Sequence, residues 1–306
     1  MTRKKMIIDT DCGSDDAMAV AMALSDANHE ILFFTTVMGN VHVRQAASNL
    51  LTVIKETYKY FPKVYVGEEN PLKREFEGSA DTHGNDGMGD LDLIDYSLNP
   101  DDGYAVDKII EALNKYDDVD IVELGPMSNL ARVLEKDKDI LKKANKIICM
   151  AGQGFGKGSQ SEYAEFNIYQ DPDACEILLK ANLDNLYFVG WDACLGDCIL
   201  NEDDIDEIKK SSSIGRFLID CNSHLIRFNK ERFKQICLDM ADPAAMMAYL
   251  HPESIEACKR YYCSVEKDDK EKYGHLYMEE NNSGNVYVIS KINAKLYKKY
   301  LKELLK

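Results

Sequence analysis

Short apolar runs and helical patterns alternate along the first two-thirds of this 306-residue chain. The first two runs, Met6–Asp9 and Ile31–Val37, predict β-strands, and a segment with helical periodicity follows each of them. A chain that alternates in this way forms parallel strands joined by crossover helices. We therefore expect an α/β fold with a mostly parallel, Rossmann-like open sheet, helices on both faces, and ligands at the carboxyl ends of the strands.

The rest of the pattern extends this arrangement and adds a helical C-terminal part. Further strands are expected at Lys63–Val66, Ile121–Leu124, Lys146–Met150 and Asn185–Val189. Helices are expected at Asp15–Leu24, Val43–Tyr58, Ala105–Tyr116, Asn129–Ala144 and Asp173–Asn182. The later elements are expected to be helices from about Asn201 to Leu250, a hairpin of Ile255–Val265 and His275–Ile292, and a helix over Lys295–Leu305. Because the sequence contains no repeat or low-complexity linker, we expect residues 1–306 to form one domain.

The charge balance argues against nucleic acid as a partner. Lys and Arg number 37 against 53 Asp and Glu, a net charge of −16, whereas phosphate backbones are bound by clustered cations. The apolar stretches are far shorter than the ~20 residues that cross a bilayer, and they are too short near the N-terminus for a signal peptide. The nine cysteines include no Cys-x-x-Cys pair, as is typical of reduced thiols. We expect a cytoplasmic protein with neither membrane nor nucleic-acid partners.

Four carboxylates follow the first predicted strand within eight residues. They are Asp9, Asp11, Asp15 and Asp16. Like charges at this spacing stay ionised together only when a cation joins them, and carboxylate oxygens favour Ca²⁺ or Mg²⁺. Capping of the following helix explains Asp15 and Asp16 but leaves Asp11 without a role. A metal site is therefore the favoured interpretation.

Two other acidic motifs fit this segment less well. An EF-hand loop that started at Asp9 would require Gly in place of Ser14 and Glu in place of Val20. A Mg²⁺ phosphohydrolase that used Asp9 and Asp11 would usually have Thr or Val in place of Gly13, and basic phosphate ligands are absent from this segment. This phosphohydrolase is the weakest alternative.

The acidic segment resembles the signature of the inosine-uridine-preferring nucleoside hydrolase family, Asp-x-Asp-x-Gly-x-Asp-Asp-Ala, which Asp9–Ala17 reproduces in full. Later blocks agree in order and spacing, so the resemblance covers nearly the whole chain. These blocks are Val37–Asn40, His83–Met88, Leu124–Asn129, Met150–Gly152, Ala164–Asn167, Asp171–Pro172 and Asp242–Pro243. The resemblance implies calcium-dependent hydrolysis of the N-glycosidic bond of a small-molecule ribonucleoside to free base and ribose, a role in nucleoside salvage, and a homodimer or homotetramer.

The resemblance also implies the ligands of the metal. One Ca²⁺ would be held by the side chains of Asp11, Asp16 and Asp242 and by the backbone carbonyl of Leu124. Asp11 would also be the base that takes a proton from metal-bound water.

The same resemblance implies the substrate contacts. The residues concerned are Asp15, Asn40, His83, Met150, Glu165, Asn167 and His224, with Asn40 and His83 also counted as catalytic. Asp15 would accept a hydrogen bond from a ribose hydroxyl. Glu165 and Asn167 would share one face of an extended segment that grips the sugar. Ser159 or Gln160 would lie near the 5′-hydroxyl.

The chain departs from the family pattern where the leaving base would be contacted. Many members have a His directly before the last metal Asp, whereas this chain has Ala241, which cannot donate a proton. The single Trp, Trp191, is expected to pack in the core. The candidates for base contact are His83, His224, Arg227, Phe228 and Asp239. Two alternatives follow: a hydrolase specific for a modified nucleoside such as queuosine, or a non-catalytic member that binds ribosides.

Overall fold

The computed structural model describes residues 3–306 and contains a nine-stranded sheet with the order β10-β9-β11-β6-β5-β4-β1-β2-β3. Its strands are β1 (Lys4–Thr10), β2 (His29–Thr36), β3 (Lys63–Val66), β4 (Val119–Glu123), β5 (Lys146–Met150), β6 (Leu186–Val189), β9 (Ile255–Val265), β10 (Leu276–Glu280) and β11 (Val286–Ile292). The seven strands from β11 to β3 pair in parallel, and β9 and β10 are antiparallel. The expected mostly parallel open sheet is confirmed.

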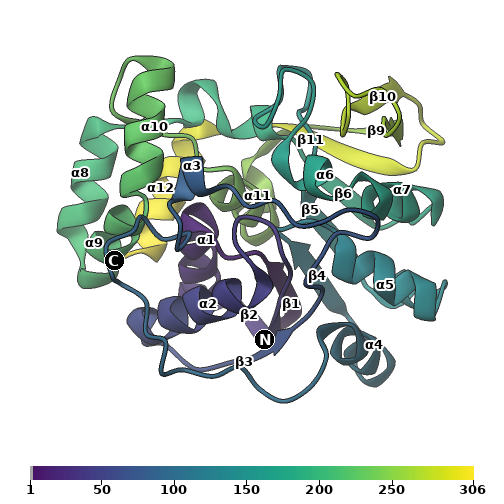
Figure 1. Cartoon of the computed structure of the whole chain (residues 1–306), viewed down its shortest axis with the longest axis horizontal. Helices are drawn as coiled ribbons and strands as arrows, with labels where there is room; N and C mark the ends of the chain where they lie inside the picture. The colour runs from purple at the N-terminus through teal and green to yellow at the C-terminus, as the bar shows by residue number, and fades with distance from the viewer. Residues whose placement is uncertain (1–2) are drawn as a thin grey trace.

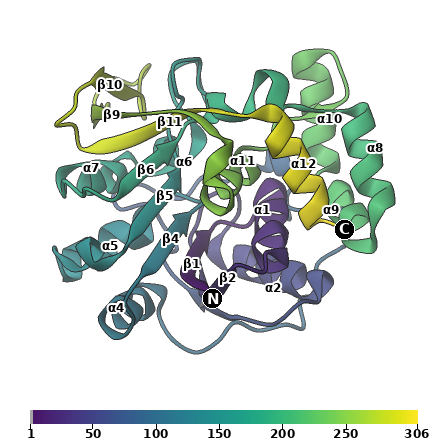
Figure 2. The ribbon, with the colours of Figure 1, turned by 180° about the vertical axis from the view of Figure 1, so that it is seen from behind.

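Helices cover both faces of this sheet (Figures 1 and 2). The α-helices are α1 (Ser14–Ser25), α2 (Val43–Thr57), α3 (Ala80–His83), α4 (Ala105–Lys115), α5 (Ser128–Lys136), α6 (Phe166–Gln170), α7 (Pro172–Lys180), α8 (Glu202–Ser211), α9 (Ser213–Cys221), α10 (Ser223–Phe233), α11 (Ala241–Leu250) and α12 (Ala294–Leu304). The helices α1, α2, α11 and α12 lie on one face, and α4, α5 and α7 lie on the other. The expected helical C-terminal part corresponds to α8–α11, with a two-stranded ladder of β7 (Leu200–Asn201) and β8 (Cys237–Leu238).

The strands supply two cores because consecutive side chains point to opposite faces of a sheet. Ile7 and Phe33 pack in the core beneath α4, α5 and α7, whereas Ile8 and Phe34 pack in the core beneath α1 and α2. Both β1 and β2 are therefore apolar on both sides, as expected for a parallel sheet covered by helices.

The sequence predicted a C-terminal hairpin of two strands, and this prediction is wrong for the second strand. The segment expected as one strand, His275–Ile292, forms two strands, β10 and β11, and β9 pairs with both of them. A turn separates the two strands, since the Asn281 side chain accepts a hydrogen bond from the Ser283 N–H and the Asn281 carbonyl accepts one from Gly284. The intervening polar residues end the strand, because Asn side chains satisfy backbone groups locally.

The helix expected at Asn129–Ala144 is also divided. The helix α5 ends at Lys136, and a single 3₁₀ turn covers Ile140–Lys143. The Asp137 carboxylate accepts a hydrogen bond from the Asp139 N–H, which gives the backbone an alternative to the helix.

Within residues 3–306, none of the helices combines the length and the apolar character that a membrane span requires.

Candidate active site

The sheet order places a site at the carboxyl ends of β1 and β4. From β1 the chain proceeds to β2 and β3 on one side, and later from β4 to β5 and β6 on the other. In open α/β sheets, ligands bind at this kind of switch point, where the loops diverge and leave a crevice. The loop after β1 carries Asp11, and the loop after β4 begins at Leu124.

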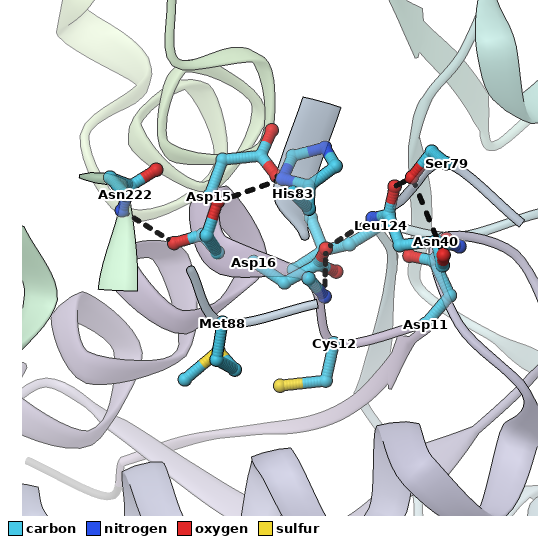
Figure 3. Close-up of polar contacts among 12 residues, drawn as sticks. Asp11, Cys12, Asp15, Asp16, Asn40, Ser79, His83, Met88, Leu124 and Asn222 are labelled. Carbon is cyan, nitrogen blue, oxygen red and sulfur yellow. Dashed lines mark hydrogen bonds and ion pairs between the residues drawn. The ribbon is translucent and has the colours of Figure 1, made fainter. Parts of the chain in front are cut away.

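Four aspartates converge at this point. Asp11 lies in the loop after β1, Asp15 and Asp16 lie in the first turn of α1, and Asp242 lies in the first turn of α11. One carboxylate oxygen from each of Asp15, Asp16 and Asp242 lies within 4.8 Å of the others. Figure 3 shows Asp11 on the same side of the α1 N-terminus as Asn40 and Leu124. The sequence-based ligand set contains Asp11, whereas the tightest trio in the structure contains Asp15.

Burial dominates the electrostatics of this cluster. Burial, together with the charge of Asp16, raises the pKa of Asp11 and of Asp242 well above the usual range. Burial and the neighbouring Asp15 raise the pKa of Asp16 to about 7. Without a compensating cation, such groups retain protons at neutral pH, because like charges repel and few polar groups solvate them.

The donor atoms of the cluster fit a hard divalent cation. Asp11 Oδ1 and Asp15 Oδ1 are buried and have no hydrogen-bond partner within the described range 3–306. Two further oxygens are held in place: Asp16 Oδ1 accepts from the Thr10 hydroxyl at 2.5 Å, and Asp11 Oδ2 accepts from the Asn40 N–H at 2.5 Å. Oriented carboxylates with free lone pairs and no sulfur or nitrogen donors are the ligands that Ca²⁺ and Mg²⁺ prefer.

Leu124 also lines the cavity, but its backbone carbonyl already accepts a hydrogen bond. Its oxygen accepts a hydrogen bond of 2.6 Å from the Asn167 side-chain amide. A carbonyl oxygen has two lone pairs, so a second partner remains compatible with this contact.

Glycines allow the loops to approach this closely. A Cβ at Gly39 would lie 2.0 Å from Asp11 Oδ2, and a Cβ at Gly125 would lie 3.0 Å from the Asp11 backbone nitrogen. Any larger side chain at Gly39 would displace the Asp11 carboxylate.

Glu165 and Asn167, which were expected to contact the sugar, line the cavity. The prediction that they lie on an extended segment is wrong, because they lie at the start of a helix. Glu165 is the N-cap of α6, and its carboxylate accepts hydrogen bonds from the backbone N–H groups of Gly152, Asn167 and Ile168. Burial raises the pKa of Glu165 to about 7. Met150, at the end of β5, also lines the cavity and contacts Asn167.

Asn40 connects the acidic cluster with Ser79. Its side-chain amide donates to Asp16 Oδ2 at 3.0 Å, and its Oδ1 accepts from the Ser79 hydroxyl at 2.8 Å (Figure 3). Asn40 and Ser79 both line the cavity. Sequence reasoning did not identify Ser79, because a lone Ser before a short helix has no distinguishing pattern.

Of the two histidines expected in the site, the structure brings one to the cavity. His83 is buried at the end of α3, where its Nδ1 lies 2.7 Å from Ser14 Oγ. The same nitrogen lies 3.8 Å from Asp15 Oδ1 (Figure 3). Burial lowers the pKa of His83 and favours the neutral imidazole. His224 is not among the residues that line the cavity, and its Nε2 lies 3.4 Å from Asp90 Oδ2.

The lining also contains a second set of side chains, which we call the aromatic end: Trp191, Leu225, Phe228, Arg232 and Asp239. Trp191 is buried, as expected, but it also faces the cavity. Phe228 and Asp239 were expected as base contacts, whereas Arg227 does not line the cavity. Arg232 was not expected. Its guanidinium lies 4.7 Å from the Trp191 ring centroid, a tertiary contact between distant segments that no local pattern reveals.

Ala241 lines the cavity together with Ser159 and Gln160. The last two residues are those expected near a 5′-hydroxyl. The cavity thus joins a polar, acidic end with an aromatic end, which is the polarity that a sugar attached to a planar base requires.

Comparison with known proteins identifies the class of enzyme to which this architecture belongs. Residues 6–299 match the family described as inosine-uridine preferring nucleoside hydrolase, so the chain belongs to this family of glycosidases. Among curated relatives, the probable uridine nucleosidase 1 of Oryza sativa subsp. japonica is 31% identical over 253 residues, which cover 82% of this chain and 78% of the relative. The pyrimidine-specific ribonucleoside hydrolase RihB of Escherichia coli (strain SE11) is 26% identical over 92% of this chain and 88% of its own length.

Solved structures agree with this assignment over the whole chain. The plant nucleoside hydrolase PpNRh1 superposes with a TM-score of 0.91 and 26% identity, over 99% of both chains. The purine-preferring ribonucleoside hydrolase of Gardnerella vaginalis superposes with a TM-score of 0.90 and 27% identity, again over 99% of both chains. The relatives' names include both pyrimidine and purine preferences, so the family alone does not define the base.

Proposed function

We propose that this enzyme hydrolyses the N-glycosidic bond of a ribonucleoside, that it requires Ca²⁺, and that it releases free base and ribose. The single observation that carries this proposal is the buried trio of Asp15, Asp16 and Asp242 beside Asp11, at the switch point of the sheet. The relatives' names support the substrate class.

The ligands that we propose for the ion are Asp11, Asp16, Asp242 and the carbonyl of Leu124. When bound, the ion would supply a more acidic water and an electrostatic grip on the two ribose hydroxyls. Asp15, which lies within the acidic trio and lines the cavity, would accept a hydrogen bond from a ribose hydroxyl.

The proton acceptor that we propose is Asp11. Its Oδ2 is fixed by the Asn40 N–H and its Oδ1 is free of donors within residues 3–306, so one oxygen orients the group while the other is available for a proton. Asn40 would orient both the attacking water and the sugar, since it already joins Asp16 to Ser79.

The opposite face of the sugar would be held by Glu165, Asn167 and Met150. Backbone donors fix the Glu165 carboxylate, and Asn167 is fixed by carbonyls of two strand ends, so these groups are oriented before the substrate arrives. Preorganised contacts of this kind lower the barrier because they need no reorientation during the reaction.

We propose that His83 contacts the substrate between sugar and base. With Nδ1 on the Ser14 hydroxyl, Nε2 is the remaining polar atom of the ring. Ala241 provides no proton donor, so the leaving base must be stabilised by other groups or must leave without early protonation. This feature keeps a modified nucleoside such as queuosine among the candidate substrates.

The test is release of reducing sugar from a panel of ribonucleosides, with and without a calcium chelator. We expect Asp11→Asn to lower kcat/KM by at least ~10³-fold, because it removes a metal ligand and the proton acceptor together. The matched control is Asp203→Asn, on the exposed first turn of α8, which should retain wild-type turnover. Undiminished turnover by the Asp11 variant would refute its role, and riboside binding without sugar release would favour the non-catalytic alternative.

Two further proposals rest on the family resemblance. We propose that residues 1–306 act as one catalytic unit and that this unit assembles as a homodimer or homotetramer. Light scattering on the purified chain measures the assembly directly, and a monomeric mass would exclude it.

A further inference from the structure

We propose that Asp239 determines base specificity by accepting two hydrogen bonds from a base that has a ring N–H next to an exocyclic amino group. Guanine and 7-deazaguanine share this edge. The inference rests on the proposed function and extends it, because it names the substrate class of the same cavity from the residues at its aromatic end.

Asp239 is an acidic residue of the cavity outside the four-aspartate cluster. It lies between β8 and α11 and lines the same cavity as Asp15 and Asp242. Trp191 and Phe228 also line this cavity, whereas the side chains proposed for the sugar lie on α1, α6, the end of β5 and the loops after β1 and β2. We infer that the base of a ribonucleoside whose ribose contacts the acidic cluster lies against Asp239.

The fold itself does not account for this buried carboxylate. The side chain is 6% exposed, and α11 begins after Met240 without any side-chain cap. No Lys, Arg or His within residues 3–306 forms an ion pair with Asp239. Among the described residues, one side chain donates a hydrogen bond to it: the Asn229 amide, 2.7 Å from Oδ1. A buried carboxylate with a single such donor lowers the free energy of unfolding unless a ligand supplies further N–H groups.

Asn229 holds the carboxylate in a fixed orientation. It is fully buried on α10, and its amide donates both to Asp239 and to the carbonyl of Cys237 at 3.2 Å. Burial raises the pKa of Asp239 to about 6, and the hydrogen bond from Asn229 opposes this shift by favouring the ionised form, which is a pure acceptor. An oriented, ionised carboxylate is complementary to two adjacent N–H donors.

Trp191 and Arg232 supply the rest of this recognition surface. The Arg232 guanidinium lies 4.7 Å from the Trp191 ring centroid, and both residues line the cavity. The Trp191 ring holds the guanidinium at the cavity wall, and a guanidinium donates to the oxo group that flanks the ring N–H of a guanine-type edge. Uracil and hypoxanthine have a ring N–H but no adjacent amino group, so each satisfies only part of the Asp239 carboxylate.

The experiment uses two pairs of nucleosides that differ only in the 2-amino group: guanosine against inosine, and 7-deazaguanosine against 7-deazainosine. We expect the wild-type enzyme to favour the amino member of at least one pair by ~10²-fold in kcat/KM, because a site built for an N–H donor rejects the analogue that lacks it. A preference in only one pair identifies which base type is accepted. In Asp239→Asn, we expect this ratio to fall at least tenfold, whereas Asp203→Asn should retain it.

Equal turnover of both members, or an equal loss for both members in Asp239→Asn, would overturn the inference. Calorimetric titration of the same four nucleosides provides a second measure that does not require turnover. If no ribonucleoside releases ribose, the proposed hydrolase activity fails, but the ratio of dissociation constants and its change in Asp239→Asn still decide the role of Asp239.

Discussion

The absence of a side chain at Gly39 is what lets the Asp11 carboxylate occupy its position. Because a Cβ there would lie 2.0 Å from Asp11 Oδ2, we expect Gly39→Ala to displace this carboxylate and lower kcat/KM by at least ~10²-fold. The measurement is steady-state ribose release, together with calcium titration of the same variant.

Gly156 provides the matched control for this substitution. A Cβ there would meet no atom closer than Asp192 Cβ at 4.0 Å, so Gly156→Ala should retain both turnover and calcium affinity. If Gly39→Ala behaves like Gly156→Ala, the Asp11 position is not the determinant that the structure suggests.

A second prediction at this scale concerns the buried carboxylate of Glu165. Burial raises its pKa from 4.5 to about 7, so the folded state retains a proton that the unfolded chain has lost within this interval. The contribution of Glu165 to the free energy of unfolding therefore falls as the pH rises from 4.5 to 7, by roughly 3 kcal/mol.

The test is urea unfolding of chelator-treated protein at pH 5, 6, 7 and 8. Because Gln cannot titrate, Glu165→Gln should lack this part of the pH dependence, and the difference between the two stability curves should widen toward low pH in favour of the wild type. Parallel curves would show that Glu165 has an ordinary pKa.

Among the secondary-structure elements, Asn129 at the start of α5 joins three strands. Its side-chain amide lies 2.9 and 3.0 Å from the two carboxylate oxygens of Asp9 on β1 and 3.0 Å from the Thr36 carbonyl on β2, while its Oδ1 accepts from the Glu68 N–H after β3. We expect Asn129→Ala to lower the free energy of unfolding by roughly 2 to 4 kcal/mol, because several buried polar groups lose their partner.

The control for Asn129→Ala is Asn114→Ala, on the exposed face of α4, which should change the stability by less than about 0.5 kcal/mol. Denaturant unfolding at one pH measures both variants. Equal stability of the two would mean that Asn129 does not join β1, β2 and the loop after β3 energetically.

Strands and helices with strong local patterns could be predicted from the sequence, and those defined by tertiary contacts could not. The alternation of apolar runs and helical periodicity located β1, β2 and α2 to within a few residues. The sequence analysis missed the division of His275–Ile292 because the turn depends on a hydrogen bond to the Asn281 side chain, which the pattern of apolar residues does not reveal.

The acidic end of the site was likewise predictable, because Asp11, Asp15 and Asp16 are close in sequence. The aromatic end was less so. Arg232 and Trp191 come from segments 41 positions apart and meet through the packing of α10. His224 was expected in the site from the family resemblance, but it is not among the residues that line the cavity, and its Nε2 lies 3.4 Å from Asp90 Oδ2.

For the molecule as a whole, the acidic cluster connects two parts of the chain that are far apart in sequence. Asp15 and Asp16 lie on α1 near the N-terminus, and Asp242 lies on α11, which packs against α1 on the same face of the sheet (Figure 2). An ion at this position would therefore oppose the separation of α11 from α1, and its binding energy would add to the stability of the whole fold.

Calcium should consequently stabilise the folded chain even without substrate. At a free concentration of 100 times Kd, a ligand that binds only the folded state adds about 2.7 kcal/mol, which corresponds to a rise in Tm of about 5 °C for a chain of this length. The measurement is calorimetry of chelator-treated protein with and without millimolar Ca²⁺. Asp16→Asn should lack the shift, whereas Asp203→Asn should show it in full. An unchanged wild-type Tm would mean that the four aspartates hold protons rather than a metal ion, and the calcium-dependent mechanism would then be wrong.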